Sequence, residues 1–180
     1  MGDTYCSLVP VSVSRASAGA VAKKFISHLI DGSIIDDRQS ACVLGSSTGY
    51  PPAKSFITVI ENPDTGLLQL STNGLAITTG RQVFHAAGVD EIRCPACGCN
   101  NIDSDWGELL DEWVRETGKD HLLCQGCGAA VSIVDYRFSP VWAFGELGFT
   151  FWNWGIFKQE FLREVEEVIG HRIVVVYGKI

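Results

Sequence analysis

The chain has 180 residues, 46% of them apolar and 19% charged, so it can bury a core of its own. No apolar run approaches the ~20 residues that span a bilayer, and residues 1–6 lack the basic and apolar segments of a secretory signal. These properties predict a cytoplasmic protein without a membrane segment. The net charge of −7 also argues against a general affinity for nucleic acid.

The first predicted element is an amphipathic helix over residues 17–31, which Gly32 ends. Residues 41–44 then predict a short strand. A meander follows, with strands at residues 56–60, 67–71 and 75–79. Asn73-Gly74 predicts a two-residue hairpin between the last two strands, because both residues tolerate a positive φ.

A second helix is predicted near residues 105–117. Asp105 precedes Glu108 by three residues, the spacing of an N-terminal capping box, and Gly118 ends the helix. The opposite face of this helix is acidic. Its apolar residues recur at i, i+3, i+4, i+7 and i+8 and form one stripe: Trp106, Leu109, Leu110, Trp113 and Val114.

The last third predicts two strands, a helix and a strand. Residues 131–138 alternate in polarity, and residues 149–154 are apolar on both faces except at Asn153. A helix is predicted over residues 157–169 with Gly170 as its stop. Residues 173–177 are β-branched and predict a strand buried on both faces. The fold class is therefore α+β, with antiparallel sheets, two main helices packed on them and an inserted segment that carries the extra helix.

Two cysteine pairs are the clearest chemical signal in the chain. Cys94 and Cys97 form one Cys-x2-Cys pair, and Cys124 and Cys127 form another, with 26 residues between the pairs. Four thiolates are the ligand set of a closed tetrahedral Zn²⁺ site, which leaves no position for a catalytic water. The spacing therefore predicts a structural zinc ion, with no catalytic or cofactor-binding residue assigned elsewhere.

Each pair is followed by glycine, at Gly98 and Gly128, and in this respect residues 92–128 resemble a zinc ribbon. The resemblance implies two cysteine knuckles that share one zinc ion. Zinc ribbons usually join their knuckles by a short hairpin, whereas this chain predicts a helix there. The organisation expected is an N-terminal α+β part at residues 1–91, the zinc-ribbon insert at 92–128 and a C-terminal part at 129–180. The two flanking parts can form one domain.

Two residues close to the pairs leave the ligand set open at this point. Cys99 lies two positions after Cys97, so it can exchange with a ligand or remain a free thiol. His121 precedes Cys124 by three residues and can replace a thiolate. Cys6 and Cys42 are expected to pack as small apolar residues.

A dense aromatic run occupies the last third of the chain. Aromatic residues dominate protein cores, so core packing is the expected role. The alternative is a partly exposed patch that binds a protein, since Trp and Phe are favoured interface anchors. The run consists of Trp142, Phe144, Phe149, Phe151, Trp152, Trp154 and Phe157.

The charge of the cysteine segment bears on function. Residues 91–128 carry three basic and eight acidic side chains, a net charge of −5, which argues against a nucleic-acid-binding ribbon. The leading hypothesis is a non-enzymatic regulatory or binding protein whose partner is a basic protein, such as an immunity-type protein that neutralises a basic toxin. The alternative is an enzyme of unknown class with a site in residues 1–90.

Overall fold

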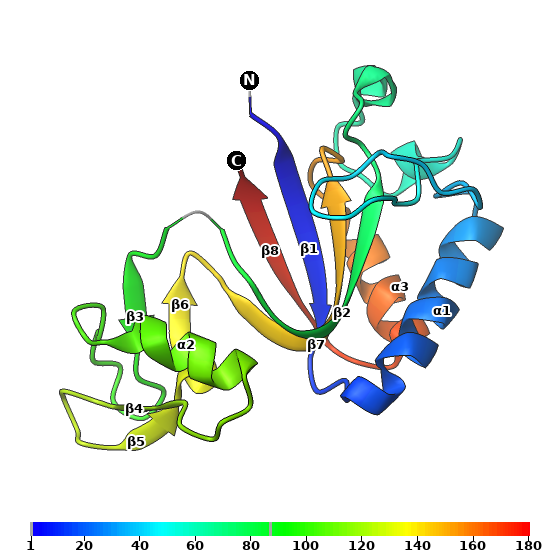
Figure 1. Cartoon of the computed structure of the whole chain (residues 1–180). Helices are drawn as coiled ribbons and strands as arrows, with labels where there is room; N and C mark the ends of the chain where they lie inside the picture. The colour runs from blue at the N-terminus through cyan, green and yellow to red at the C-terminus, as the bar shows by residue number, and fades with distance from the viewer. Residues whose placement is uncertain (1, 87) are drawn as a thin grey trace.

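The computed structural model describes residues 2–86 and 88–180 and shows a mixed α+β fold, as predicted (Figure 1). Four antiparallel strands form the main sheet in the order β2-β7-β1-β8, and two further sheets have two strands each, β3-β6 and β4-β5. The strands are β1 (Thr4–Pro10), β2 (Leu75–Phe84), β3 (Glu91–Arg93), β4 (His121–Leu123), β5 (Ala130–Ser132), β6 (Arg137–Ser139), β7 (Ala143–Trp152) and β8 (Ile173–Lys179). The helices are α1 (Arg15–Asp31), α2 (Trp106–Val114) and α3 (Gln159–Ile169).

Strand β1 lies inside the main sheet, although the sequence pattern predicted no element there. It pairs with β7 on one side and β8 on the other, so that Cys6 lies between Phe151 and Tyr177. Alternate β1 side chains point to opposite faces. Cys6 and Leu8 join the main core, as expected for Cys6, while Tyr5 and Ser7 belong to the other face.

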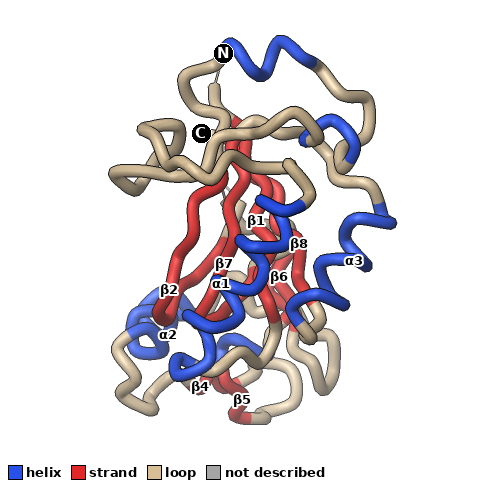
Figure 2. Tube along the Cα trace, turned by 90° about the vertical axis from the view of Figure 1, so that its right-hand side faces the viewer, coloured by secondary structure: helices blue, strands red, loops and turns tan. Residues whose placement is uncertain are grey.

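Helices α1 and α3 cover one face of this sheet and lie side by side (Figures 1 and 2). Phe25 of α1 packs edge-on against Phe149 of β7 at a centroid distance of 4.7 Å, and both are fully buried. Most of the aromatic run lies in the same core: Phe149, Phe151, Trp154 and Phe157 are at most 1% exposed. The prediction of core packing is therefore confirmed for these residues.

The ends of the main helices follow local rules. Helix α1 begins two residues earlier than predicted, because the Ser14 hydroxyl accepts the Ser17 N–H as an N-cap. It ends at Gly32, as predicted. Helix α3 ends at Gly170, which has a left-handed φ of 75° and donates its N–H to the Glu166 carbonyl.

Two glycine-to-alanine changes test this helix chemistry with opposite signs. Gly170→Ala is expected to lower the free energy of unfolding by about 1 kcal/mol, because alanine is strained at a positive φ. Gly19→Ala, inside α1, is expected to raise it by about 0.5–1 kcal/mol. A Cβ at either position meets no atom within 4 Å, so backbone conformation alone decides the sign. Urea denaturation of the two variants measures both effects, and equal signs would contradict the argument.

Three predicted strands in the first half are wrong. Residues 56–60 and 67–71 form 3-10 helices at Phe56–Thr58 and Thr65–Gln69 instead. Residues 41–44 have no strand structure, and Asn73-Gly74 leads into β2 without forming a hairpin. Apolar runs this short do not distinguish a strand from a buried turn. The segment between α1 and β2 closes over the core through Phe56, Val59 and Ile60 instead of extending the sheet.

Two predictions in the last third also need correction. β8 is an edge strand, and within it only Val176 is fully buried, so burial on both faces is wrong. The alternating segment 131–138 is broken by a 3-10 helix at Ile133–Asp135, which separates β5 from β6. A β-branched composition marks these residues as strand formers without revealing their place in the sheet.

The cysteine segment and its flanking residues, between Phe84 and Ala143, form a module beside the main sheet. Strands β2 and β7 are the longest strands, and they curve away from the helices toward the module (Figure 1). The chain enters after Phe84 and returns at Ala143, which are paired in the ladder. No helix in residues 2–86 and 88–180 is long and apolar enough to cross a membrane.

Candidate metal centre

The two predicted cysteine pairs come together in space. The Sγ atoms of Cys94, Cys97, Cys124 and Cys127 all lie within 4.8 Å of one another. Cys97 Sγ lies 3.6 Å from Cys124 Sγ, and Cys94 Sγ lies 4.0 Å from Cys127 Sγ. A tetrahedron with Zn–S bonds of about 2.3 Å has S···S edges of about 3.8 Å. The cluster thus has the size of a four-thiolate metal site.

Both pairs adopt the same local structure. In the first turn the Gly98 N–H donates to the Cys94 carbonyl, and in the second the Gly128 N–H donates to the Cys124 carbonyl, each at 2.9 Å. Gly98 and Gly128 have φ values of 75° and 73°, which L side chains rarely adopt. The glycines therefore allow each turn to present two sulfur atoms to one point.

A buried asparagine joins the two turns. Asn101 is fully buried, and its amide Nδ2 donates to the Cys99 carbonyl at 2.8 Å and lies 3.7 Å from Cys124 Sγ. Its Oδ1 accepts the Gln125 N–H at 2.9 Å. Such contacts fix the orientation of ligand residues. Asn101 was not predicted from the sequence, because nothing in its local pattern separates it from a loop residue.

The electrostatics of the cluster favour a bound cation. Cys94 and Cys124 are each only 2% exposed, and burial of uncompensated thiolates is unfavourable. Backbone N–H groups, first that of Cys127 and also that of Gly126, lower the pKa of Cys124 to about 6. A backbone N–H also acts to lower the pKa of Cys97, but hydrogen bonds with the neighbouring thiols, first that of Cys124, outweigh it and raise this pKa to about 12. The four thiols therefore do not all ionise readily without a cation. A divalent metal ion supplies the positive charge that four converging thiolates require.

Comparison with protein-family models, curated protein sequences and solved structures finds no match for this chain. The likeness to zinc ribbons therefore depends on the cysteine spacing and on the geometry of the two turns.

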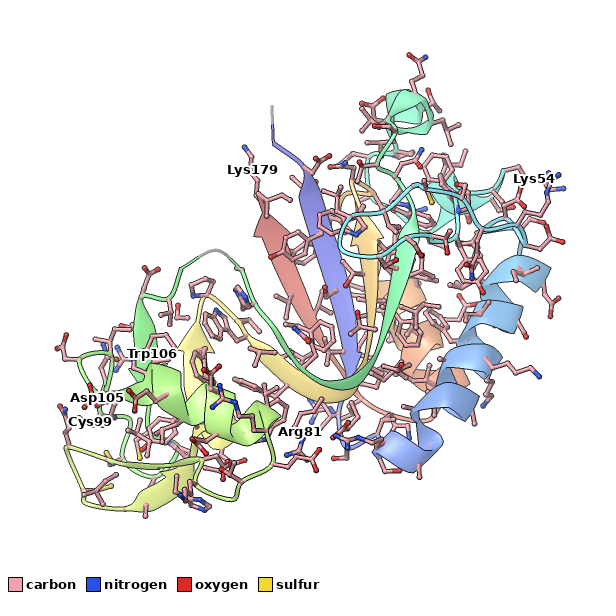
Figure 3. The ribbon with its side chains drawn as sticks, in the orientation of Figure 1. Lys54, Arg81, Cys99, Asp105, Trp106 and Lys179 are labelled. Atoms are coloured by element: carbon pink, nitrogen blue, oxygen red, sulfur yellow. The ribbon has the colours of Figure 1, made fainter. Side chains whose placement is uncertain are left out.

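Neither of the two neighbouring candidates belongs to the cluster of ligand atoms in the described residues. Cys99 directs its Sγ toward the Asn100 carbonyl at 3.6 Å and lies at the outer end of the module (Figure 3). His121 is exposed and pairs with Asp120, with Nδ1 3.4 Å from the carboxylate. The four regularly spaced cysteines are thus the set that the fold brings together.

Helix α2 covers the module between the two turns, where the sequence predicts a helix. Trp106 lies edge-on to Phe138 and Trp142, at centroid distances of 6.3 and 5.9 Å. Leu109, Leu110 and Trp113 join the same core, but Val114 is 41% exposed, so the predicted stripe ends one residue early. Asp105 occupies the N-cap position without a capping hydrogen bond from its side chain, which makes the predicted capping box wrong.

An ion-pair network connects the module to the main domain. Arg81 of β2 bonds the Glu146 carboxylate of β7 at 3.0 Å and the Trp113 carbonyl of α2 at 3.1 Å. The same guanidinium lies 4.8 Å from the centre of the Trp113 ring. Arg15 of α1 also pairs with Glu146, at 3.2 Å, and with Glu116. Glu146 and Glu116 therefore each pair with both arginines, and Glu146 is the less exposed of the two carboxylates.

The pH dependence of the stability of the Glu146→Gln variant tests this network. Burial alone would raise the pKa of Glu146, but hydrogen bonds and charge from Arg81 and Arg15 outweigh it and lower the pKa. Its stabilising contribution is thus present above the ordinary carboxyl pKa and is lost as the pH falls through the lowered value. The variant is expected to lose about 1–2 kcal/mol at neutral pH and little in acid.

Urea unfolding at about pH 7 and about pH 3 measures the difference. Glu160→Gln is the control, because Glu160 makes an exposed pair with Arg163 on α3 and is expected to change stability little. A loss at Glu146 that is the same at both pH values would contradict the assignment.

Proposed function

We propose that the chain binds one Zn²⁺ through Cys94, Cys97, Cys124 and Cys127, and that the ion has a structural role. The observation that supports this proposal is the convergence of four thiol ligands with S···S distances of 3.6 and 4.0 Å. Four protein ligands complete the shell of zinc, so such an ion holds the fold together and does not activate water. Elemental analysis of protein purified without added metal is expected to give one zinc per chain.

We further propose that the protein is a non-enzymatic binding protein with a basic protein as its partner. The support is the distribution of charge. At the start of α2, Asp103, Asp105 and Glu108 are exposed and have no ion pair among the described residues. The zinc ion would hold this acidic surface in place. Complementary charge accelerates association and selects partners, so an immunity-type protein that neutralises a basic toxin fits this surface.

Affinity capture from the native host tests the partner. The zinc-loaded wild-type chain is compared with the triple variant Asp103→Asn, Asp105→Asn, Glu108→Gln. The control removes the same charge from α3 by Glu160→Gln, Glu164→Gln and Glu167→Gln. A basic protein retained by wild type and the α3 variant, lost by the α2 variant and released by salt is the expected result. Capture that is unaffected by the α2 changes would reject this surface.

A further inference from the structure

The face of the main sheet that points away from α1 and α3 carries a cleft of about 400 Å³. Residues of β1, β2 and β7 form its floor, and the loop at residues 44–46 borders it. The cleft lies outside the metal centre and shares no lining residue with it. Cavities of this size hold small organic molecules.

A pair of hydroxyl groups lies in the middle of this floor. Ser7 of β1 and Thr150 of β7 are opposite each other in the ladder, and their hydroxyl oxygens lie 2.8 Å apart. Ser7 is only 2% exposed. One hydroxyl of the pair donates to the other, which leaves the second hydrogen without a partner among the described hydrogen bonds. The floor therefore offers one donor and several lone pairs to a molecule above it.

Aromatic rings rest on glycines on both sides of this pair. A Cβ on Gly148 would lie 2.2 Å from the Phe84 ring, and one on Gly178 would lie 2.2 Å from the Tyr5 ring. Gly148 is two residues from Thr150 along β7, and Tyr5 is two residues from Ser7 along β1, about 7 Å in each case. The hydroxyl pair thus lies between the Phe84 ring on one side along the strands and the Tyr5 ring on the other, and all four residues line the cleft.

Trp152 and His85 complete the polar and aromatic lining. The Trp152 ring lies 5.2 Å from the Tyr5 ring, and the Tyr5 hydroxyl donates to the His85 carbonyl at 2.6 Å. His85 Nδ1 lies 2.8 Å from the Ala86 carbonyl. Since a carbonyl only accepts, Nδ1 carries the hydrogen, and in the Nδ1–H tautomer Nε2 is an acceptor without a partner among the described hydrogen bonds.

The lining also limits the charge of a ligand. Among the described residues, no lysine, arginine, aspartate or glutamate side chain lines the cleft. A phosphate or carboxylate would lose hydration there without a compensating cation. The lining combines hydroxyl, imidazole and Gln82 amide groups with aromatic rings and aliphatic side chains, and this favours an uncharged ligand with several hydroxyls and an apolar face.

We propose that this cleft binds an uncharged sugar ring, either as a free monosaccharide or as the ribose of a nucleoside. The C–H face of the ring would pack on Tyr5 and Trp152, whose rings present apolar surfaces. Its hydroxyls would exchange hydrogen bonds with the Ser7–Thr150 pair and donate to His85 Nε2. This binding does not require the proposed protein partner, so either proposal can fail without the other.

The experiment is a ligand-observed NMR titration of the metal-loaded full chain, with Trp fluorescence as the second readout. The probes are glucose, galactose and ribose in one arm, and adenosine and uridine in the other. Saturable binding of at least one probe is expected, with a Kd of about 1 mM or below. Binding confined to one arm identifies the source of the ring. Failure of all probes to bind would overturn the proposal.

Two controls locate the site. Thr150→Val keeps the shape of the side chain and removes the hydroxyl, and it is expected to weaken binding about tenfold. Thr79→Val makes the same change at a threonine of β2 that does not line the cleft, and binding is expected to stay unchanged. Equal affinities for the two variants would exclude this site.

Discussion

Cys124→Ser is expected to abolish metal binding and to unfold the cysteine module while the main sheet persists. Structural zinc contributes about 10–16 kcal/mol to folding in zinc-finger peptides. Seven residues form the buried core of the module, and two of them are the ligand residues Cys94 and Cys124, so loss of the metal also disturbs this core. Hydrogen exchange is expected to show lost protection in α2 and β4 and retained protection in β1. Chelation of the metal from the wild-type protein is expected to give the same pattern.

Cys99→Ser is the matched control for this prediction. It changes the same atom only two residues from Cys97, but Cys99 Sγ is outside the ligand cluster. The variant is expected to retain one metal ion per chain and the wild-type exchange pattern. If Cys99→Ser loses the metal, or if Cys124→Ser keeps it with full stability, the assigned ligand set is wrong.

Trp154→Ala is expected to cost about 3–5 kcal/mol, the largest effect of any single core substitution discussed for the main domain. Trp154 is 1% exposed, and its ring contacts Phe56, Phe151 and Phe157. Its indole Nε1 also donates to the Asn73 carbonyl at 2.5 Å, so the substitution leaves a buried acceptor unpaired. Denaturation by urea, followed by far-UV circular dichroism, measures the loss.

A nearby residue separates core packing from an interface role. Ile156 is two positions further along the chain and 55% exposed, so Ile156→Ala is expected to change stability by less than about 0.5 kcal/mol. If Trp154→Ala were as mild as Ile156→Ala, Trp154 would not be a core residue in solution.

Local patterns predicted the helices and the cysteine cluster well. Helix α1 and helix α3 each combine a 3.6-residue apolar period with a glycine stop, and both signals lie within the segment itself. The sequence signal of each cysteine pair is equally local, because each knuckle is a short turn closed by its own glycine. The convergence of the two pairs was predicted because four cysteines at this spacing can share one metal ion.

Non-local pairing explains what the sequence pattern missed. β1 is short, and its position between β7 and β8 depends on residues far along the chain. The segment at residues 56–60 is apolar enough for a strand, but no sheet edge receives it, and it folds as a 3-10 turn over the core. The hydroxyl pair of the cleft was missed for the same reason, since Ser7 and Thr150 meet only through strand register.

The position of β1 affects the order in which parts of this protein can fold during synthesis. Tyr5 is synthesised well before its ladder partners Trp152 and Gly178. The main sheet therefore stays incomplete until both partners have been made, and contacts of such long range slow folding. The cysteine turns need only 26 intervening residues. The four cysteines can thus come together, ready to bind a metal ion, before β1 has both of its neighbouring strands.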